Sequence, residues 1–351
     1  MTKYQGTTLG KLKIPLHIFQ EGNLTFSDVI VDYLVDPSHL KWNGERNTWL
    51  YSPDNDLRLP TDIRAYIKPM VEKRRKEAET RGAPFFDGQM VRLVDYGIKV
   101  EDKDAEIEKD RLILKVAPTS FFTYSATNKS IDEKILTDQY EKPISIRNKY
   151  GLNVLNLNDC LSNPIGVSST VISEPDHKLV MVERSEKLAQ YPSLYGDAGA
   201  GFMDWTRDVV AGAPSPFKTI QRELEEETGV KCSINDFKLF TVGRALDDLH
   251  GELFGEVRTN YTVQEILSAP KSKKYESLRM IDVPFVPKEV LKYVTATIDK
   301  IPTGVPTESG AWVIGQSPKW VPAHAVNTVQ SLVREYGQEK VMRELAGLGF
   351  A

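Results

Sequence analysis

Three glutamates spaced for one face of a helix are the feature of this chain with the clearest chemistry. Glu223, Glu226 and Glu227 lie at positions i, i+3 and i+4, which share a face of an α-helix. Carboxylates gathered in this way suit a hard divalent cation such as Mg²⁺ or Mn²⁺. Like charges at these spacings destabilise an isolated helix by roughly 0.2–0.5 kcal/mol per pair, which a bound cation would reverse. The alternative is a solvated acidic surface, which is what most runs of charge form.

The neighbouring residues predict that this helix is capped and partly buried. Ser215 followed by Pro216 is typical of a helix start, and Gly229 is typical of a helix end in the left-handed conformation. Ile220 and Leu224 have the spacing of a buried stripe beside the acidic face. We therefore expect one side of the helix to pack against a core and the next side to present oxygen ligands.

The segment from Arg222 to Val230 matches every specified position in the second half of the Nudix box, Arg-Glu-aliphatic-any-Glu-Glu-any-Gly-aliphatic. The segment resembles a Nudix hydrolase. This resemblance implies an α/β/α sandwich with a mixed sheet, in which Arg222 is a structural ion-pair partner and Gly229 ends the helix. The first half of the box departs from the pattern, because Asp208 and Pro214 stand where glycine and glutamate are usual.

Candidate substrate ligands lie outside the helix. The glycine turn of the box is expected upstream, at Gly199-Ala200-Gly201, with Gly199 and Gly201 contacting substrate. Arg184 and Arg244 lie near predicted strand ends, where each is either a phosphate ligand or an ordinary surface arginine.

A further catalytic acid is expected after the helix. Glu252 and Glu256 lie in the connection where Nudix enzymes often supply an additional base, and they rank equally.

Composition limits the classes of function. A length of 351 residues predicts two domains or one enlarged domain, and 40% apolar residues are enough for a core. The formal charge of −4 gives no electrostatic case for nucleic acid as the main partner. Cys160 and Cys232 are the only cysteines, which argues against a zinc site and against a disulfide scaffold. No apolar run approaches the ~20 residues needed to cross a bilayer, and no signal sequence is evident, so a cytoplasmic protein without a membrane partner is expected.

Periodicity predicts an order of strands and helices along the chain. Residues 89–96 and 111–117 alternate like two paired strands, and 164–184 has the pattern of a second hairpin. A helix beginning near Ile63 is expected to kink or restart at Pro69. After the acidic helix we expect strands at 237–242, 253–261 and 280–286, a helix with a capping box at Thr262, a helix over 287–298, a loop over 301–310 and a final helix from 320 to 336.

Several short segments, in their order, resemble the two-part Nudix proteins that hydrolyse UDP-glucose and UDP-galactose. These segments are Thr119-Ser120-Phe121, Thr127-Asn128, Pro164 to Val167 and Arg184-Ser185. The resemblance implies a β-rich region at 1–159 that selects substrate and a Nudix domain with C-terminal helices at 160–351. The hydroxyl-rich segment from Pro118 to Asn128 is expected to be a loop. Asn128 offers both a donor and an acceptor to a base or sugar, or else caps a turn.

The function that these features imply is metal-dependent hydrolysis of a nucleoside diphosphate linked to a group X. A UDP-sugar would yield UMP and a sugar 1-phosphate. The alternatives are ADP-ribose, a dinucleotide or a capped RNA end as substrate, and a module that senses a nucleotide without cleaving it. The oligomeric state is left open.

Overall fold

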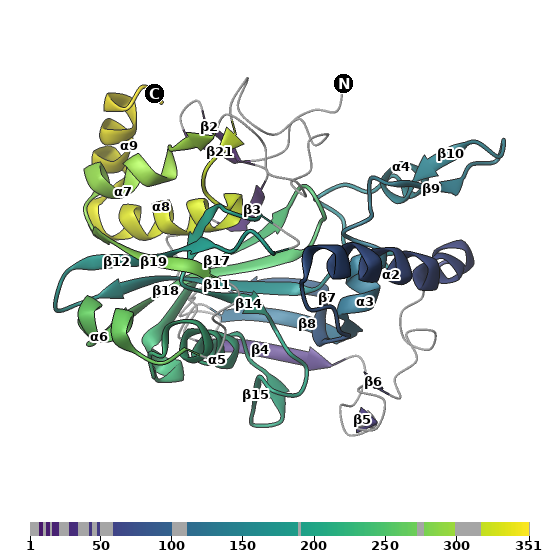
Figure 1. The fold of residues 1–351 in the computed structure, drawn as a ribbon, viewed down its shortest axis with the longest axis horizontal. Coiled ribbons are helices and arrows are strands. Elements are labelled where there is room, and N and C mark those ends of the chain that lie inside the picture. Colours follow the sequence, from purple (N-terminus) through teal and green to yellow (C-terminus); the bar gives the residue numbers. More distant parts are fainter. Residues whose placement is uncertain are drawn as a thin grey trace.

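The protein has mixed α and β structure, as expected (Figure 1). The computed structural model describes residues 59–98, 111–188, 191–271, 277–296 and 319–350 in full, and it describes short strands elsewhere by their backbone. The loop predicted over 301–310 lies outside the described residues. No helix in the described ranges is both long enough and apolar enough to cross a membrane.

An eight-stranded mixed sheet forms the centre of the molecule. Its strands follow the order β13 (Tyr195–Asp197), β12 (Lys178–Arg184), β11 (Ile165–Ser173), β18 (Gly251–Thr259), β17 (Phe237–Ala245) and β3 (Leu16–Gln20), with β14 (Gly199–Phe202) paired to β11 and β19 (Ser277–Pro284) paired to β12. Strands β11 and β18 are parallel, and the other pairs are antiparallel. The predicted hairpin over 164–184 and the strands after the acidic helix are therefore confirmed.

Helices cover both faces of this sheet, so the predicted sandwich is present. The helix α5 (Pro216–Thr228) packs on one face, where Ile220 joins Val167 of β11 in one hydrophobic cluster. The helix α8 (Pro322–Tyr336) packs on the other face, where Val329 joins Ile172 of the same strand. Strand β11 is buried along its whole length, which is expected for a strand covered on both faces.

A second, three-stranded sheet is built from strands that follow β3 and precede β11 in the chain. It contains β4 (Asp28–Tyr33), β8 (Arg111–Ser120) and β7 (Gln89–Lys99) in that order, and it confirms the two strands predicted over 89–117. Five buried side chains of β7 and β8 belong to the same hydrophobic cluster as β11 and α5, namely Val91, Leu93, Leu112, Leu114 and Val116. The Val91 amide donates to the carbonyl of Met203 at 3.0 Å, and the Leu93 amide donates to that of Asn163 at 2.8 Å. Residues on the two sides of position 160 therefore share one core.

The helix α2 (Thr61–Arg81) continues through Pro69 without a break, so the predicted restart there is wrong. Proline removes one backbone hydrogen bond and crowds the preceding turn. The flanking side chains of Met70 and Val71 are buried against α3 (Phe121–Ala126), and this tertiary packing favours a continuous helix. Figure 1 shows α2 and α3 side by side.

Two predicted loops are regular elements. The segment from Pro118 to Asn128 is the end of β8 followed by α3, whose first turn is capped by Ser120 accepting from the Thr123 amide at 3.3 Å. The predicted glycine turn is strand β14, which pairs with β11 over four residues. Both segments contain residues that local rules assign to turns, but tertiary pairing decides their structure.

The structure also describes elements outside the two sheets and the helices α2, α3, α5 and α8. They are β1 (Thr7–Leu9), β2 (Leu12–Ile14), β5 (Trp42–Asn43), β6 (Thr48–Trp49), β9 (Lys134–Thr137), β10 (Pro143–Ser145), α4 (Ile146–Tyr150), β15 (Val209–Val210), β16 (Ala213–Pro214), the 3-10 helix η2 (Ile234–Asp236), α6 (Val263–Ser268), α7 (Pro287–Val294), β20 (Thr297–Ile298), β21 (Ser317–Pro318) and α9 (Gln338–Gly347). The capping box at Thr262 is confirmed, α7 is shorter than predicted, and α9 was not predicted.

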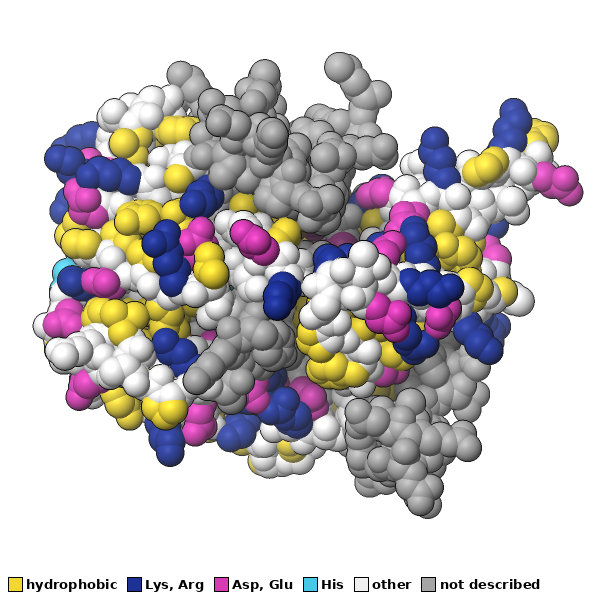
Figure 2. All heavy atoms as spheres, in the orientation of Figure 1, with side chains coloured by type: hydrophobic (Ala, Val, Ile, Leu, Met, Phe, Trp, Pro, Cys, Tyr) yellow, Lys and Arg dark blue, Asp and Glu magenta, His cyan; other side chains and the backbone are white. Residues whose placement is uncertain are grey.

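The surface mixes charges of both signs. In the face shown in Figure 2, lysine and arginine side chains lie among aspartates and glutamates. This distribution agrees with the small net charge and shows no large basic patch on that face.

Candidate active site

The acidic helix α5 forms with the predicted boundaries. Pro216 is its first residue, and Gly229 follows it with a φ of 75°, in the left-handed region that glycine adopts without strain. A Cβ at Gly229 would lie 2.6 Å from the Cβ of Ala269, so the close approach also requires glycine. Ser215 precedes the helix, but its hydroxyl makes no capping hydrogen bond.

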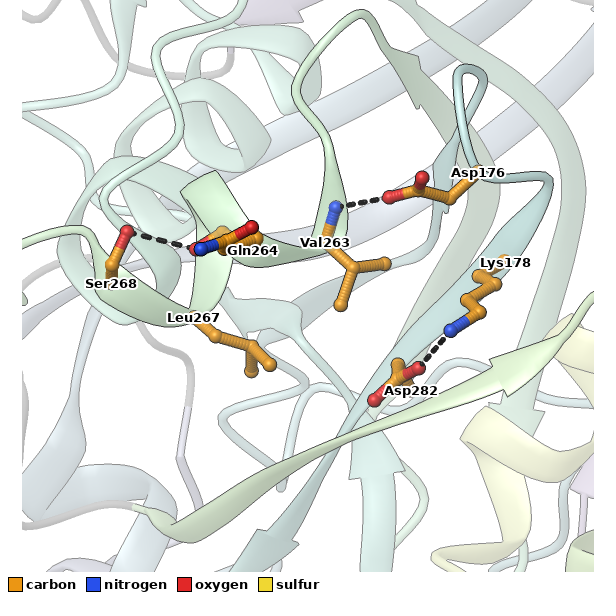
Figure 3. Close-up of a pocket in the computed structure, with 7 residues that line it drawn as sticks. All are labelled: Asp176, Lys178, Val263, Gln264, Leu267, Ser268 and Asp282. Atoms are coloured by element: carbon orange, nitrogen blue, oxygen red, sulfur yellow. Dashed lines mark hydrogen bonds and ion pairs between the residues drawn. The ribbon is translucent and has the colours of Figure 1, made fainter.

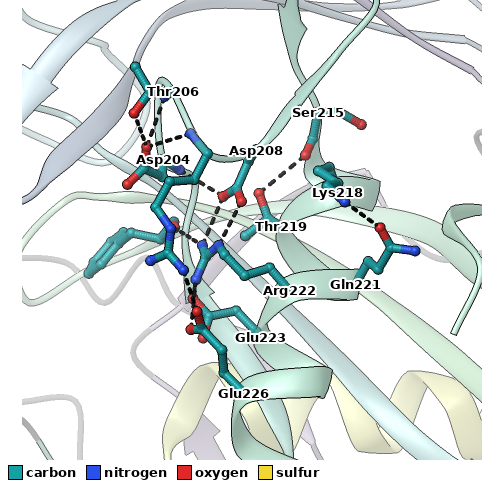
Figure 4. A network of polar contacts seen from close by, with 12 residues as sticks. Asp204, Thr206, Asp208, Ser215, Lys218, Thr219, Gln221, Arg222, Glu223 and Glu226 are labelled. Atoms are coloured by element: carbon teal, nitrogen blue, oxygen red, sulfur yellow. Dashed lines mark hydrogen bonds and ion pairs between the residues drawn. The ribbon is translucent and has the colours of Figure 1, made fainter. Parts of the chain in front are cut away.

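Two of the three carboxylates converge on a single nitrogen. Nη1 of Arg222 donates to Oε1 of Glu223 at 2.5 Å and to Oε2 of Glu226 at 3.3 Å (Figure 4). Glu223 is buried and Glu226 is mostly buried, so both acids are held in place. Glu227 is partly buried on the same helix. Across the part of the chain that the structure describes, no three His, Cys, Asp or Glu side chains form a group that could hold a metal ion.

Arg222 is fixed by an aspartate that the sequence pattern did not identify. Its Nε and Nη2 donate to Oδ1 and Oδ2 of Asp208 at 2.6 and 2.8 Å, and Asp208 is completely buried. Burial opposes the charge on Arg222, but Asp208 and Glu223 together raise its pKa above the ordinary value. Nη2 also donates to the Phe202 carbonyl at 3.3 Å. A bidentate pair of this kind combines charge with fixed geometry.

The departure in the first half of the Nudix-like pattern has a structural origin. The small hairpin of β15 and β16 lies between β14 and α5, and Pro214 is part of it. Asp208 holds the base of this hairpin, because its carbonyl accepts from the Ser215 amide at 2.7 Å and its Oδ2 accepts from the Asp204 amide at 2.9 Å. Arg207 in the same loop pairs with Glu226.

Gly199 and Gly201 contact the helix, whereas we had expected them in an open turn that touches substrate. A Cβ at Gly201 would overlap the carboxylate of Glu223, and one at Gly199 would lie 2.8 Å from Cδ2 of Leu224. The two glycines therefore allow α5 to approach β14 closely. Their position supports a packing role in place of the expected substrate contact.

Arg244 is a candidate phosphate ligand by its sequence position, but the structure buries it in the protein interior. Its side chain is fully buried, and its guanidinium donates to five acceptors, which are the carbonyls of Leu249, Asn153, Val154 and Asn156 and Oδ1 of Asn163. Burial lowers its pKa to about 10. The geometry supports a structural role, in which Arg244 ties residues 153–163 to the turn between β17 and β18.

Asn128 is enclosed as well, although we expected it to select a base or sugar. Its Nδ2 donates to the Asp248 carbonyl at 2.7 Å, and its Oδ1 accepts from the Asn163 amide at 3.1 Å. The side chain is completely buried. These contacts favour the alternative reading, in which Asn128 holds neighbouring turns together.

Replacing Asn128 with alanine is therefore expected to reduce stability and not substrate affinity. A buried partner left unsatisfied costs about 1–3 kcal/mol, so the free energy of unfolding should fall by that amount. Denaturant unfolding measures this loss, and a kinetic titration on the same variant measures KM. A raised KM with unchanged stability would restore the substrate-contact interpretation.

A second buried polar network lies next to this turn. His250 bonds Asp248 through Nδ1 and Oε1 of Glu252 through Nε2, the latter at 2.5 Å. The Tyr124 hydroxyl donates to Oδ2 of Asp248 at 2.6 Å, and the hydroxyl of Tyr191 bonds Asp247. Burial opposes the charge on His250, yet the two adjacent carboxylates raise its pKa well above the usual value.

The two candidate bases differ in their surroundings. Glu252 belongs to the His250 network and lies against Gly166, where a Cβ would be 2.6 Å from its Oε2. Glu256 instead accepts from Nε of Arg258 at 3.0 Å. Leu253 and Val257 of the same strand face the α5 cluster, so the alternation of a strand directs both glutamates toward the α8 side of the sheet. The structure does not bring either of them into the α5 carboxylate group.

Phe202 connects the two clusters. Its ring centroid lies 5.5 Å from that of His250 and 5.1 Å from that of Tyr124, and its carbonyl accepts from Arg222. Arg184 lies at the end of β12, where its Nε donates to the Tyr191 carbonyl at 3.2 Å. Apart from Glu256, which pairs with Arg258, the predicted site residues therefore fall into an α5 group and a group around Asp248.

A cavity of about 570 Å³ lies elsewhere, beside α6 (Figure 3). Its charged groups already have partners, because Lys178 pairs with Asp282 at 2.7 Å and Asp176 accepts from the Val263 amide at 2.6 Å. None of the predicted site residues lines it. We place no catalytic site there.

Comparisons with known proteins give only weak likenesses. No family model matches the sequence, and no curated protein matches it. Among solved structures, a MutT/nudix family protein from Enterococcus faecalis is 12% identical, with 55% of this chain and 70% of that chain covered and a TM-score of 0.32. A MutT protein from Methanosarcina mazei is 18% identical, with 33% and 73% covered and a TM-score of 0.24.

A third solved structure is a bifunctional NMN adenylyltransferase/ADP ribose pyrophosphatase from Francisella tularensis, complexed with AMP and a Mn ion. It is 17% identical, with 34% of this chain and 33% of that chain covered and a TM-score of 0.24. Likenesses of this size do not establish a shared function.

Proposed function

We propose that this protein is a divalent-metal-dependent hydrolase of the pyrophosphate bond in a nucleoside diphosphate linked to a group X. The observation that carries the proposal is the convergence of Glu223 and Glu226 on one cationic nitrogen, within a helix that matches the second half of the Nudix box. A guanidinium nitrogen bound by two carboxylates marks a point where positive charge is stabilised. A divalent cation requires the same environment.

The donor set fits a hard cation in part. Carboxylate oxygens are the ligands that Mg²⁺ and Mn²⁺ prefer, and two such groups already face one point. We propose Glu223, Glu226 and Glu227 as the residues that would hold the metal. When bound, the metal would supply Lewis-acid stabilisation of charge on the phosphates and lower the pKa of an attacking water.

The remaining residues of the group have positioning roles in this proposal. Asp208 holds the Arg222 guanidinium in a fixed plane, and Arg222 in turn orients Glu223 and Glu226. Gly201 leaves space for the Glu223 carboxylate against β14. Neither candidate base has a role in this proposal, because the alternation of β18 directs both Glu252 and Glu256 toward the α8 side of the sheet.

We propose a UDP-sugar as the substrate, cleaved to UMP and a sugar 1-phosphate. Support comes from the order of the short segments between Thr119 and Ser185, which resembles the two-part proteins that act on UDP-glucose and UDP-galactose. ADP-ribose, a dinucleotide and a capped RNA end are substrates of the same class. A nucleotide-sensing module is the rival from another class, and the altered first half of the box favours it.

Incubating the full chain with UDP-glucose and Mg²⁺ or Mn²⁺ is expected to yield UMP and glucose 1-phosphate, and excess EDTA should abolish the reaction. Chromatography of the products checks this, with UDP-galactose and ADP-ribose assayed in parallel. A larger kcat/KM for ADP-ribose than for either UDP-sugar would replace the proposed substrate. Binding of nucleotides without product formation, at any metal concentration, would favour the sensing module.

A further inference from the structure

Lys129, three residues after the end of α3, has an ammonium group that forms no ion pair within the described ranges of the chain. Its Nζ lies 5.3 Å from the ring centroid of Phe121 and 5.2 Å from that of Tyr124. Its backbone amide donates to the Tyr124 carbonyl at 3.1 Å and its carbonyl accepts from Arg74 at 3.3 Å, but its Nζ makes no hydrogen bond or ion pair with any residue in the described ranges of the chain. Cation–π contacts orient an ammonium group, but they do not neutralise its charge.

The charges around Lys129 come from three other elements. Burial lowers its pKa to about 8; Asp248, in the turn between β17 and β18, opposes this shift, whereas the nearby guanidinium groups of Arg74, Arg184 and Arg81 reinforce it. The carboxylate of Asp248 is already engaged by Tyr124 and His250. An anionic ligand would therefore relieve repulsion at this position as well as form a direct contact.

The position of Lys129 relates it to the α5 carboxylates. Its aromatic neighbour Tyr124 stacks edge-on against Phe202 at 5.1 Å between centroids, and the Phe202 carbonyl accepts from Arg222. In this series of contacts Tyr124 and Phe202 lie between the Nζ of Lys129 and Arg222, which binds the α5 carboxylates. An anion at Lys129 other than a pyrophosphate held at α5 would be another group of the same ligand.

We propose that Lys129 binds a second anionic group of the substrate, a carboxylate or a phosphate outside the scissile pyrophosphate. Arg184, from the end of β12, contributes to the positive potential at this position. The protein then selects nucleoside diphosphate compounds that carry this additional charge. The inference rests on the proposed function for the position of the pyrophosphate.

Two pairs of ligands test it, because the members of each pair differ by one anionic group. UDP-glucuronate adds a carboxylate to UDP-glucose, and NADP⁺ adds a phosphate to NAD⁺. Dissociation constants are measured by calorimetry in EDTA, so that no turnover is needed, and kcat/KM is measured with Mg²⁺. We expect the wild-type protein to prefer the more anionic member of one pair by about ten- to a hundredfold, the range of a hydrogen bond to a charged group. The pair that shows the preference identifies the group as carboxylate or phosphate.

Lys129→Met keeps the length of the side chain and removes its charge, and should bring this preference to about one. Lys134→Met, an exposed lysine on β9, is the matched control and should retain the wild-type ratio. Lys129→Arg should retain a preference. Because the ammonium form binds the anion, the affinity of the wild-type protein for the more anionic ligand should fall as pH rises through about 8, and Lys129→Arg should lose this inflection.

The outcomes separate the inference from the proposed function. If no ligand is hydrolysed but Lys129→Met removes a binding preference, the result would support the anion site and refute the proposed hydrolase activity. Hydrolysis with no preference in either pair would overturn the anion site alone. A lowered melting temperature in Lys129→Met with an unchanged preference would show that the lysine only stabilises the aromatic cluster.

Discussion

Replacing Glu226 or Glu227 with glutamine is expected to lower kcat for the metal-dependent reaction by at least about a hundredfold. Glutamine keeps the shape of the side chain but removes the negative charge that would hold the cation, so stabilisation of the transition state is lost. Folding should survive Glu226→Gln, because the contact of Glu226 with Arg207 involves a half-exposed arginine and Arg222 keeps its bidentate pair with Asp208. Initial rates over a range of Mg²⁺ concentrations measure the effect.

The matched control is Glu225→Gln on the same helix. Glu225 is exposed on the opposite side and lies 3.9 Å from Lys231, so it should keep the wild-type rate and metal dependence. Wild-type turnover in either Glu226→Gln or Glu227→Gln would refute the assignment of metal ligands. An equal loss in Glu225→Gln would point to a general electrostatic effect of the acidic helix.

The largest effect on stability is expected at Asp208. Its replacement by alanine leaves the Arg222 guanidinium mostly buried without its bidentate partner, and breaking a buried pair in this way costs about 3–5 kcal/mol. The free energy of unfolding from denaturant titration should fall by this amount. Glu339→Gln, which breaks the exposed pair with Arg343, is the control and should change stability by less than about 1 kcal/mol.

The double variant Asp208→Ala, Arg222→Met sharpens this test. Arg222 also pairs with Glu223 and Glu226, so removing both charges would leave the buried Glu223 carboxylate without its cation, and the double variant should be less stable than Asp208→Ala alone. If Asp208→Ala destabilises the protein no more than the Glu339→Gln control does, the pair does not anchor the hairpin to α5.

Local patterns predicted the elements whose signals lie within a few neighbouring residues. The helix α5 was found because Pro216 and Gly229 mark its ends, and the β7–β8 and β11–β12 pairs because their residues alternate. Metal ligation by the carboxylates of α5 stays a prediction. Strand β14 was mistaken for a turn because glycine is a turn signal, whereas its glycines serve the approach of a helix distant in sequence.

Residues whose partners lie far along the chain could not be assigned from the sequence. Asp208 looked like a departure from the box, and only the fold shows that it pairs with Arg222. Arg244 looked like any arginine at a strand end, but carbonyls from residues 153–156 surround it. Lys129 carried no motif at all. In each case the missing information was the tertiary neighbourhood.

Residues before and after position 160 share one hydrophobic core, so the two parts of the chain do not pack independently. Val91 and Leu114 from the preceding sheet pack in the same cluster as Leu224 of the acidic helix, and backbone hydrogen bonds cross between the two parts. A change in volume on one side must therefore be accommodated on the other, because packed interiors tolerate few voids. We propose that the region before position 160 selects the substrate and that α5 binds the metal. These two parts would have to vary together, so an exchange of one part between relatives would require exchange of the other.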